Sequence, residues 1–305
     1  MTGYTTEVSV IIPLYGEHRG RTSIPAVTAA WLAQDVPCEV IIATAGDLSL
    51  GDTGGARLVR AAPSLRAPGL LRNAGAAVAR GRMLYLSDAD VAPLGRDYLT
   101  RALAAARHRE GAWAQPWMYR LDGAGEHAEH GPVVDLRPGP SRDGRPYCTV
   151  TAGPGGVLRP LPGEVIVRRS MLHCGTVTDV AVMYPPPGPA PDSGDRRDWR
   201  APFHWGAMLL ERRLFDAVGG YCRRYYGWGG EDDDLFVKVA SRTPVTMAWA
   251  EAGTGISCLH FEHSYPYSGT PEREANSDLY ARRTAEGPEA MIGQDLADAR
   301  AASRS

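Results

Sequence analysis

The chain has 305 residues, of which 44% are hydrophobic and 22% are charged, and its formal net charge is −2. This length allows one large α/β domain or two small ones, with a core that needs neither disulfides nor metal. The composition excludes wholesale disorder, and the near-neutral charge excludes the general attraction to nucleic acid that a basic protein has. All but one of the 33 basic residues are arginines, the exception being Lys238, which indicates GC-rich coding and a bacterial source.

Cysteine spacing and hydropathy bear on where the protein works. The five cysteines are scattered and form no C-x-x-C pair, so neither a disulfide framework nor a zinc ribbon is expected. The first twenty residues lack a basic start followed by a long apolar stretch, and no run approaches about 20 apolar residues. We therefore expect a cytoplasmic protein without a transmembrane segment.

The N-terminal third of the chain alternates buried strands with helices. Strands are predicted over residues 8–14, 38–44 and 83–87, and helices over residues 22–34, 70–80 and 97–109. This alternation predicts an α/β fold with a mostly parallel central sheet flanked by helices. Ligands of such sheets bind beyond the carboxyl ends of the strands.

Regular patterning stops in the middle of the chain. Residues 122–200 are rich in Pro and Gly and hold only short apolar runs, VIV and TVTDVAVMY, so we expect an insertion or active-site lid there. Over residues 205–220, LLERRLFDAVGG predicts a helix that ends at glycine, and DDLFVKVA predicts another after Glu231. The tail beyond Glu272 is polar, alanine-rich and helix-prone.

Asp88 and Asp90 are two carboxylates separated by one residue at the end of the third predicted strand. Residues two apart in an extended chain point to the same side, so both could face one ligand. Two close carboxylates repel each other, and a divalent cation relieves this repulsion when water or substrate phosphates fill its remaining positions. The alternative is a solvated turn with two surface acids, because D-x-D is a short motif.

The segment GWGGEDDDLF, residues 227–236, is more specific. Its glycines let the backbone approach a ligand closely, and Trp228 offers a flat ring on which sugars commonly pack. The four acids that follow are favoured at a helix N-terminus by the macrodipole, which is the structural alternative. Capping, however, explains neither four adjacent carboxylates nor the Trp-Gly-Gly before them. The segment therefore predicts a ligand site.

His260 and His263 lie three residues apart in CLHFEHSYPY. One helical turn or a suitable bend would aim both at one cation, and neutral imidazole is a common ligand of transition-series divalents. The alternative is two unrelated loop histidines. If both bind, the spacing predicts a site for a divalent cation, Mn²⁺ or Mg²⁺.

Three segments resemble GT-A-fold, family-2-like glycosyltransferases. VSVIIPLYGE resembles the family's nucleotide-binding strand, LLRNAGAAVARGRMLYLSDADV its metal-binding D-x-D region, and GWGGEDDDLF its carboxy-terminal acceptor motif. The last motif is most similar to that of the β-1,4-galactosyltransferases, and more loosely to those of chondroitin-type polymerases and polypeptide N-acetylgalactosaminyltransferases. The resemblance covers roughly residues 8–91 and 204–267, whereas residues 122–200 match no family.

The resemblance implies a single GT-A domain over residues 1–305. Its expected parts are a nucleotide-sugar and metal-binding half (1–110), the Gly/Pro-rich insertion or lid (122–200), an acceptor-binding and catalytic half (201–270) and a C-terminal helical tail (271–305).

The resemblance also implies roles for single residues. Asp232 falls on the catalytic base and Glu231 on the residue that contacts the acceptor. Asp90 falls on a metal ligand, while His260 and His263 keep the spacing of a later Met and His ligand pair but replace the Met. The nucleotide-sugar site is expected to include Pro13, Leu14, Tyr15, Glu17, Asp47, Arg72, Asp88, Trp228, Gly229 and Gly230. One departure is Ala45-Gly46-Asp47, where the family usually has an acidic run, so the nucleobase contact is expected to differ.

The implied activity moves a sugar from a nucleotide-diphosphate sugar, with a UDP-sugar as the first expectation, to a nucleophile of a glycan, peptide or secondary-metabolite acceptor. Retaining relatives read WGGEN rather than WGGED, so the motif favours inversion, with Asp232 and the metal-bound leaving group on opposite faces of the sugar. The alternatives are a retaining transferase and a non-catalytic nucleotide-sugar-binding protein. A nucleotidyltransferase would also use D-x-D, but it would have no use for GWGGEDDD. No nucleic-acid partner is expected, and the donor sugar and the oligomeric state stay open.

Overall fold

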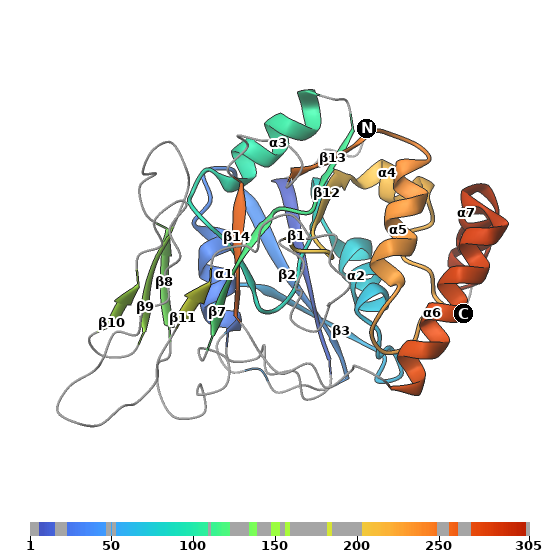
Figure 1. Cartoon of the computed structure of the whole chain (residues 1–305), viewed down its shortest axis with the longest axis horizontal. Helices are drawn as coiled ribbons and strands as arrows, with labels where there is room; N and C mark the ends of the chain where they lie inside the picture. The colour runs from blue at the N-terminus through green and yellow to red at the C-terminus, as the bar shows by residue number, and fades with distance from the viewer. Residues whose placement is uncertain are drawn as a thin grey trace, which may run out of the picture.

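The computed structural model of the protein is organised around one large sheet. The structure describes residues 6–15, 23–46, 50, 53–108, 111–122, 134–138, 148–152, 156–158, 182–184, 203–248, 256–261 and 270–302. Within this part of the chain, helices lie on both sides of the sheet, and the C-terminal helices form one end of the molecule (Figure 1).

The central sheet has seven strands in the order β13-β6-β12-β4-β1-β2-β3. Their bounds are β1 (Thr6–Leu14), β2 (Cys38–Ala45), β3 (Arg57–Ala61), β4 (Gly81–Leu86), β6 (Ala112–Ala114), β12 (Met208–Glu211) and β13 (Val245–Met247). β1, β2, β3 and β4 pair in parallel, and so do β6 and β13, whereas β12 runs antiparallel to both of its neighbours. The sheet is therefore mostly parallel.

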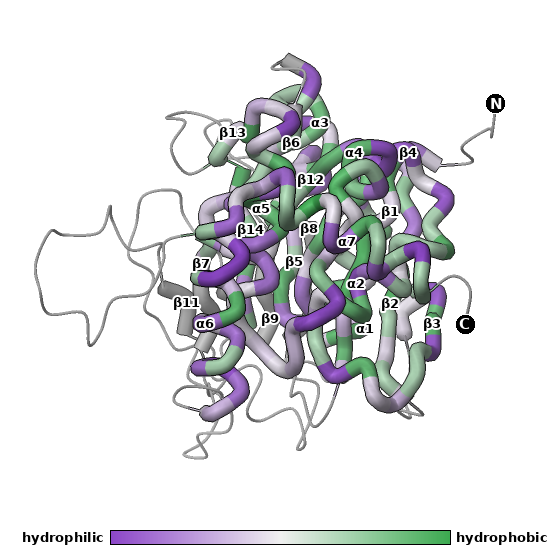
Figure 2. Tube along the Cα trace, turned by 90° about the vertical axis from the view of Figure 1, so that its right-hand side faces the viewer, coloured by the Kyte–Doolittle hydropathy of each residue, from purple (hydrophilic) through white to green (hydrophobic). Residues whose placement is uncertain are grey.

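Helices cover both faces of this sheet, which explains the apolar runs in its strands. The helices are α1 (Ile24–Leu32), α2 (Pro68–Val78), α3 (Tyr98–His108), α4 (Arg212–Ala217), α5 (Glu231–Ala240), α6 (Pro271–Glu286) and α7 (Pro288–Ala302). Alternate residues of β1 enter two separate cores: Val10 and Ile12 pack with side chains of α1 and α3, and Ile11 packs with side chains of α2, α4, α5 and α7. Hydrophobic residues follow the inner elements, whereas α6 is largely hydrophilic (Figure 2).

A second sheet brings distant segments to the edge of the site. Its order is β11-β7-β14-β5. Its strands are β5 (Val91–Pro93), β7 (Trp117–Asp122), β11 (Val182–Tyr184) and β14 (Ser257–Phe261), and a separate sheet holds β8 (Val134–Pro138), β9 (Cys148–Ala152) and β10 (Gly156–Leu158). Because β14 pairs with β5 in the register His260 to Val91, His260 lies beside the D-x-D turn although 170 residues separate them in the chain.

The predicted fold class is confirmed in its main features: the protein is α/β, with a mostly parallel sheet flanked by helices. One prediction is wrong. The residues LLE, Leu209–Glu211, were expected to begin a helix, but they form most of β12, and only the following six residues form α4. Leu209 and Leu210 are buried and the whole segment pairs with β4, so packing in the sheet overrides its helix propensity. Among the helices that the structure describes, none has the length and hydropathy needed to cross a membrane.

Candidate active site

A cavity of about 550 Å³ opens at the carboxyl ends of β1 and β4, where ligands of parallel sheets bind. Its walls come from the ends of these strands, from α2, from the loop before β12, from the GWGG loop with the start of α5, and from β14 and α6. The residues that line it are Pro13, Tyr15, Pro68, Arg72, Asp88, Ala89, Asp90, Met118, Phe203, His204, Trp205, Gly206, Trp228, Gly229, Gly230, Glu231, Asp232, Asp233, His260, Arg273, Ser277 and Tyr280.

The cavity brings most of the predicted site residues together. Those that line it are Pro13, Tyr15, Arg72, Asp88, Asp90, Trp228, Gly229, Gly230, Glu231, Asp232 and His260. Leu14 differs from the prediction: it alternates with Pro13 along β1, and its side chain is buried in the core instead of lining the cavity. Glu17, Asp47 and His263 lie outside the described residues.

Arg72 joins the two acidic motifs. It projects from α2 with only 1% of its side chain exposed, and its Nη2 and Nη1 lie 2.5 Å from Asp88 Oδ1 and 2.9 Å from Asp232 Oδ1. Burial alone would lower the pKa of Arg72, but the charges of Asp232 and Asp88 outweigh it and raise the pKa above its usual value. The guanidinium therefore stays charged and holds the end of β4 against the start of α5.

The second oxygen of Asp88 has a partner that sequence reasoning missed. His204 is 5% exposed, and its Nε2 lies 2.8 Å from Asp88 Oδ2. Burial would raise the pKa of Asp88, but Arg72 and His204 together lower it to about 2. Because an ionised carboxylate only accepts hydrogen bonds, Nε2 of His204 carries the proton. No spacing rule links these two residues, since the fold joins segments 116 residues apart.

Asp90 and His260 form the part of the site that fits a metal. Both are buried, and Asp90 Oδ2 lies 3.7 Å from His260 Nε2. The backbone holds them together, because the N–H of Phe261 donates to the carbonyl of Asp90 at 2.8 Å. A carboxylate oxygen beside an imidazole nitrogen suits a transition-series divalent. Within the described part of the chain, no group of three or more such side chains is present.

The GWGG loop turns into α5 through backbone angles that favour glycine. Gly229 and Gly230 have φ of 110° and 84°, and Gly230 is the residue before the first turn of α5. The N–H of Gly229 donates to Glu231 Oε2 at 2.8 Å. Asn276 of α6 fixes the same loop, because its Nδ2 donates to the carbonyls of Tyr226 at 2.8 Å and Trp228 at 3.3 Å.

The helix turns the four adjacent acids in different directions, since successive residues of an α-helix are about 100° apart. Glu231 is 2% exposed and faces the cavity. Asp232 accepts from Arg72 and, at 3.0 Å, from the hydroxyl of Tyr221. Asp233 accepts from Nε1 of Trp205 at 2.7 Å. Burial, with a smaller contribution from Asp232, raises the pKa of Glu231 to about 8, so this carboxyl is protonated at neutral pH.

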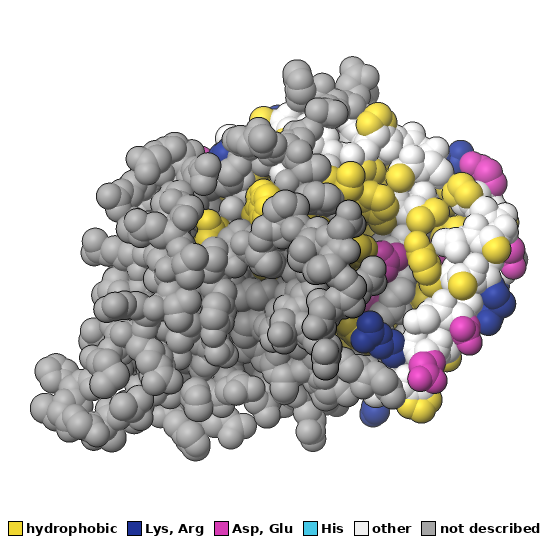
Figure 3. Space-filling view, viewed as in Figure 1, with side chains coloured by type: hydrophobic (Ala, Val, Ile, Leu, Met, Phe, Trp, Pro, Cys, Tyr) yellow, Lys and Arg dark blue, Asp and Glu magenta, His cyan; other side chains and the backbone are white. Residues whose placement is uncertain are grey.

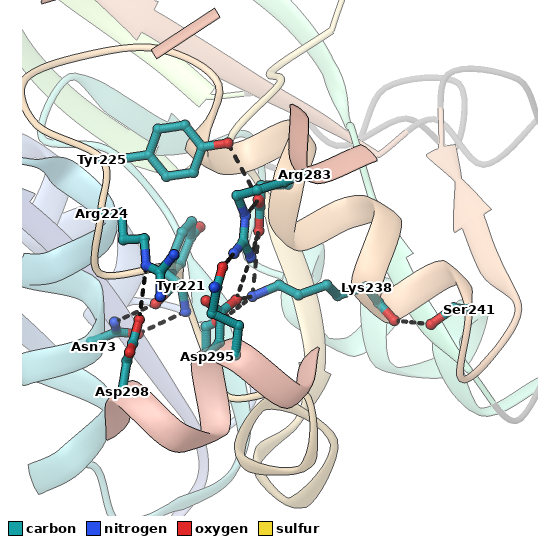
Figure 4. A network of polar contacts seen from close by, with 12 residues as sticks. Asn73, Tyr221, Arg224, Tyr225, Lys238, Ser241, Arg283, Asp295 and Asp298 are labelled. Carbon is teal, nitrogen blue, oxygen red and sulfur yellow. Dashed lines mark hydrogen bonds and ion pairs between the residues drawn. The ribbon is translucent and has the colours of Figure 1, made fainter. Parts of the chain in front are cut away.

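Asp234, the fourth acid, does not line the cavity but pairs with Lys238 and Arg283 in a buried charge network. Figure 4 shows Lys238, Arg283 and Asp295 of this network together. The carboxylate oxygens of Asp234 lie 2.6 Å from Nε of Arg283 in α6 and 3.4 Å from Nζ of Lys238. Asp295 of α7 completes the network, with Oδ2 at 2.5 Å from Lys238 Nζ and 2.7 Å from Arg283 Nη2. The negative charges of the two aspartates are thus balanced by the positive charges of the lysine and the arginine. They fasten α5, whose first turn lines the cavity, to both C-terminal helices.

No pattern in the sequence predicted that the C-terminal tail contributes to the site. The side chains of Arg273, Ser277 and Tyr280 line the cavity, and their spacing of four and three residues puts them on one face of α6. This spacing is visible in the sequence, but a uniformly polar helix does not indicate which face is buried. Figure 3 shows charges of both signs spread over the surface at this end of the molecule.

Comparison with known proteins supports the class of enzyme. A family model described as the N-terminal domain of galactosyltransferase matches residues 192–263. Beta-1,4-galactosyltransferase 4 of Homo sapiens is 38% identical over 56 residues, which are 18% of this chain and 16% of that protein. The chain therefore spans about a sixth of the length of this curated relative.

Solved structures with a similar fold share little sequence with this chain. GalNAc-T7 with UDP, GalNAc and Mn²⁺ is 16% identical at a TM-score of 0.49, over 91% of this chain and 47% of that one. S. aureus TarS 1-349 in complex with UDP-GlcNAc is 15% identical at a TM-score of 0.48, over 96% and 71%. The catalytic domain of Drosophila beta1,4galactosyltransferase 7 in complex with xylobiose is 15% identical at a TM-score of 0.41, over 90% and 80%.

The family match bears on two predictions made from the sequence. It confirms the predicted enzyme class, a glycosyltransferase, over the segment that it covers, which contains β12, α4, α5 and β14. With the mostly parallel sheet described above, the predicted α/β fold class of the GT-A type is also confirmed.

The buried network gives a prediction about stability. Arg283→Met leaves Asp234 and Asp295 buried with Lys238 as their only basic partner in the network, so we expect the free energy of unfolding to fall by about 3–5 kcal/mol. Urea unfolding followed by circular dichroism measures this change. The control is Arg282→Met, one position away on the exposed face of α6, with an expected change within about 0.5 kcal/mol. Equal losses in both variants would contradict the role given to the network.

Glu231 gives a prediction about pH. Its pKa rises from an ordinary 4.5 to about 8, so between these values the folded chain holds a proton that the unfolded chain has released. The free energy of unfolding therefore falls as the pH rises through this window. Glu231→Gln removes this pH dependence. We therefore expect the free energy of unfolding of the variant, relative to that of the wild type, to increase by up to about 1.4 kcal/mol for each pH unit in this window.

The measurement is urea unfolding in EDTA at several pH values between 5 and 8. Glu286→Gln, at an exposed position of α6, is the matched control and should follow the wild type. If the free energies of unfolding of the wild type and of Glu231→Gln change in parallel with pH, Glu231 is ionised throughout the window and the prediction is contradicted.

Proposed function

We propose that this chain is a metal-dependent, inverting glycosyltransferase that moves a sugar from a nucleotide-diphosphate sugar, a UDP-sugar in the first instance, to a hydroxyl of a glycan, peptide or small-molecule acceptor. The observation that carries the proposal is the bridge made by Arg72, which joins Asp88 of D-x-D and Asp232 of the acceptor motif across one cavity. The family match over residues 192–263 supports the same class of reaction. The cytoplasmic location and bacterial source stay predictions from the sequence.

The donor end of the proposed site is the side formed by β1, β4 and β14. Pro13 and Tyr15 would contact the nucleoside, and Asp90 with His260 would hold the cation, together with His263 as predicted from its spacing. A bound Mn²⁺ or Mg²⁺ supplies positive charge that stabilises the departing diphosphate. Arg72 is committed to two carboxylates, so its contribution here is to fix Asp88 and Asp232 in place.

Asp232 is the proposed base. Its Oδ1 accepts from Arg72 and Tyr221, whereas Oδ2 accepts no hydrogen bond within the described residues. A side chain at position 206 would fill the space beside Oδ2, because a Cβ there would lie 2.9 Å from it. Gly206 therefore leaves room for the acceptor hydroxyl to approach this oxygen.

The proposed reaction is a single displacement. The acceptor oxygen forms a bond to the anomeric carbon while the bond from that carbon to the diphosphate oxygen breaks, and Oδ2 of Asp232 takes the acceptor proton. The nucleoside diphosphate leaves with the electron pair of the broken bond. Glu231, protonated at neutral pH, can donate a hydrogen bond to the acceptor, which fits its predicted contact role.

Metal dependence is tested first with UDP-glucose, UDP-galactose and their N-acetylamino forms. Because the acceptor is unidentified, release of UDP by slow transfer to water is the readout. We expect release with Mn²⁺, less with Ca²⁺, which prefers all-oxygen shells, and none in excess EDTA. Undiminished release in EDTA would contradict the metal roles of Asp90 and His260, and no release with any of these sugars would count against the donor class.

Substitutions in the two acidic motifs should affect different steps, namely sugar transfer for Asp232 and nucleotide binding for Asp90. Asp232→Asn is expected to lower UDP release at least about 100-fold, yet to leave the Kd of UDP with Mn²⁺ within about threefold, because a base acts on the acceptor. Asp90→Asn is expected to raise that Kd about tenfold or more. Calorimetry measures binding, and Asp216→Asn, at an exposed position of α4, is the control for the substitution itself. Wild-type release by Asp232→Asn would exclude this residue as the base.

A further inference from the structure

The α6 wall of the cavity has a basic side chain that is not neutralised. Arg72 is paired with Asp88 and Asp232, but the guanidinium of Arg273 makes no ion pair within the described part of the chain. Its Cζ lies 4.9 Å from the centroid of the Trp228 ring. The cavity therefore offers a positive charge on its α6 side, apart from the side where Asp90 and His260 lie.

The GWGG loop holds Arg273 in place. A Cβ at Gly229 would lie 3.6 Å from Arg273 Cγ, so the loop packs directly on the stem of the arginine. A guanidinium stacked over a tryptophan ring keeps its N–H groups at the edge of its plane available. Such an edge matches the two oxygens of a carboxylate or phosphate.

The neighbouring residues of α6 add uncharged polar groups. The hydroxyl of Ser277 donates to the carbonyl of Arg273 at 3.0 Å, which leaves its oxygen free to accept from a ligand hydroxyl. Burial, and then the charges of Asp233 and Asp234, raises the pKa of Tyr280, so its phenol stays neutral and can donate. These groups suit the hydroxyls of a sugar that is anchored at Arg273.

An aromatic platform lies in the same cavity. Trp205 is 46% exposed, and its ring is stacked on Phe203 at 5.1 Å between centroids. The hydrogen bond from its Nε1 to Asp233, on the first turn of α5, fixes the orientation of the ring. Flat exposed rings of this kind pack against the apolar faces of sugars.

We propose that the α6 wall binds an acceptor sugar that carries an anionic group, a carboxylate or a phosphate, and that Arg273 pairs with this anion. The inference rests on the proposed function, because it takes the α5 and α6 side of the cavity as the acceptor side. The donor diphosphate is assigned to the opposite side, where Asp90 and His260 hold its cation. Arg273 is thus a specificity-determining residue for the acceptor.

The test compares three probes that differ only at C6 of glucose: 4-nitrophenyl β-glucoside, the corresponding glucuronide and the 6-phosphate. Saturation-transfer NMR titrations measure their Kd on the full chain, both alone and with UDP and Mn²⁺. We expect at least one charged probe to bind tenfold or more tighter than the glucoside. The tighter of the two charged probes identifies carboxylate or phosphate as the preferred anion.

Variants assign the preference to one side chain. Arg273→Gln should reduce the ratio of charged to neutral affinity to within twofold of one, and Arg273→Lys should restore part of it. Arg282→Gln, an exposed arginine of the same helix outside the cavity, should keep the wild-type ratio.

The proposal is overturned by equal affinity of the wild type for all three probes, by no binding of either charged probe, or by an Arg273→Gln variant that keeps the preference. If Arg273→Gln instead weakens UDP binding tenfold, Arg273 contacts the donor, which also overturns it. Failure of the proposed function gives a different pattern, namely no binding of UDP with Mn²⁺ while the charged probes still bind to the chain alone.

Discussion

A single buried guanidinium holds the site together. Arg72 lies between Asp88, which follows the central strand β4, and Asp232, which opens α5, and both ion pairs are within 3 Å. A buried arginine is stable only when carboxylates surround it, and these carboxylates would repel each other without it. Each half of the site thus depends on the other. Asp88, at the end of β4, shares Arg72 with Asp232 only if α5 begins beside this strand end. Gly230 and the C-terminal helices fix the position at which α5 begins.

Of these C-terminal helices, α6 acts mainly through buried charged and polar side chains, whereas α7 also places Met291 and Ile292 in the protein interior. α6 is hydrophilic along most of its length, yet Arg283 and Asn276 are buried and bind α5 and the GWGG loop, respectively. Exposed ion pairs at this end contribute at most about 1 kcal/mol each, whereas removing one member of a buried pair costs several times more. The anchoring of α5 therefore depends on a few buried charges, and Lys238, the one lysine of the chain, is among them.

The sequence predicted the strands and loops that short, local residue patterns specify. Apolar, β-branched runs identified β1, β2 and β4, and the Trp-Gly-Gly before Glu231 identified a segment that lines the cavity. It could not identify contacts made by chain topology. His204 reaches Asp88 only because antiparallel β12 inserts beside β4, and the same insertion turned an expected helix at Leu209–Glu211 into a strand. α6 has no apolar face to reveal its buried side, so its part in the cavity left no readable pattern.

The acidic motif shows how four adjacent carboxylates can coexist. Each is relieved of repulsion by a different means, because the helix turns each toward different surroundings. Glu231 is buried and takes up a proton, Asp232 pairs with Arg72, Asp233 accepts from Trp205 at the edge of the cavity, and Asp234 pairs with Arg283 and Lys238. The first three face the cavity and the last faces the protein interior. One turn of helix therefore both lines the cavity and anchors α5 in the fold, and its four acids are not interchangeable although all of them are carboxylic acids.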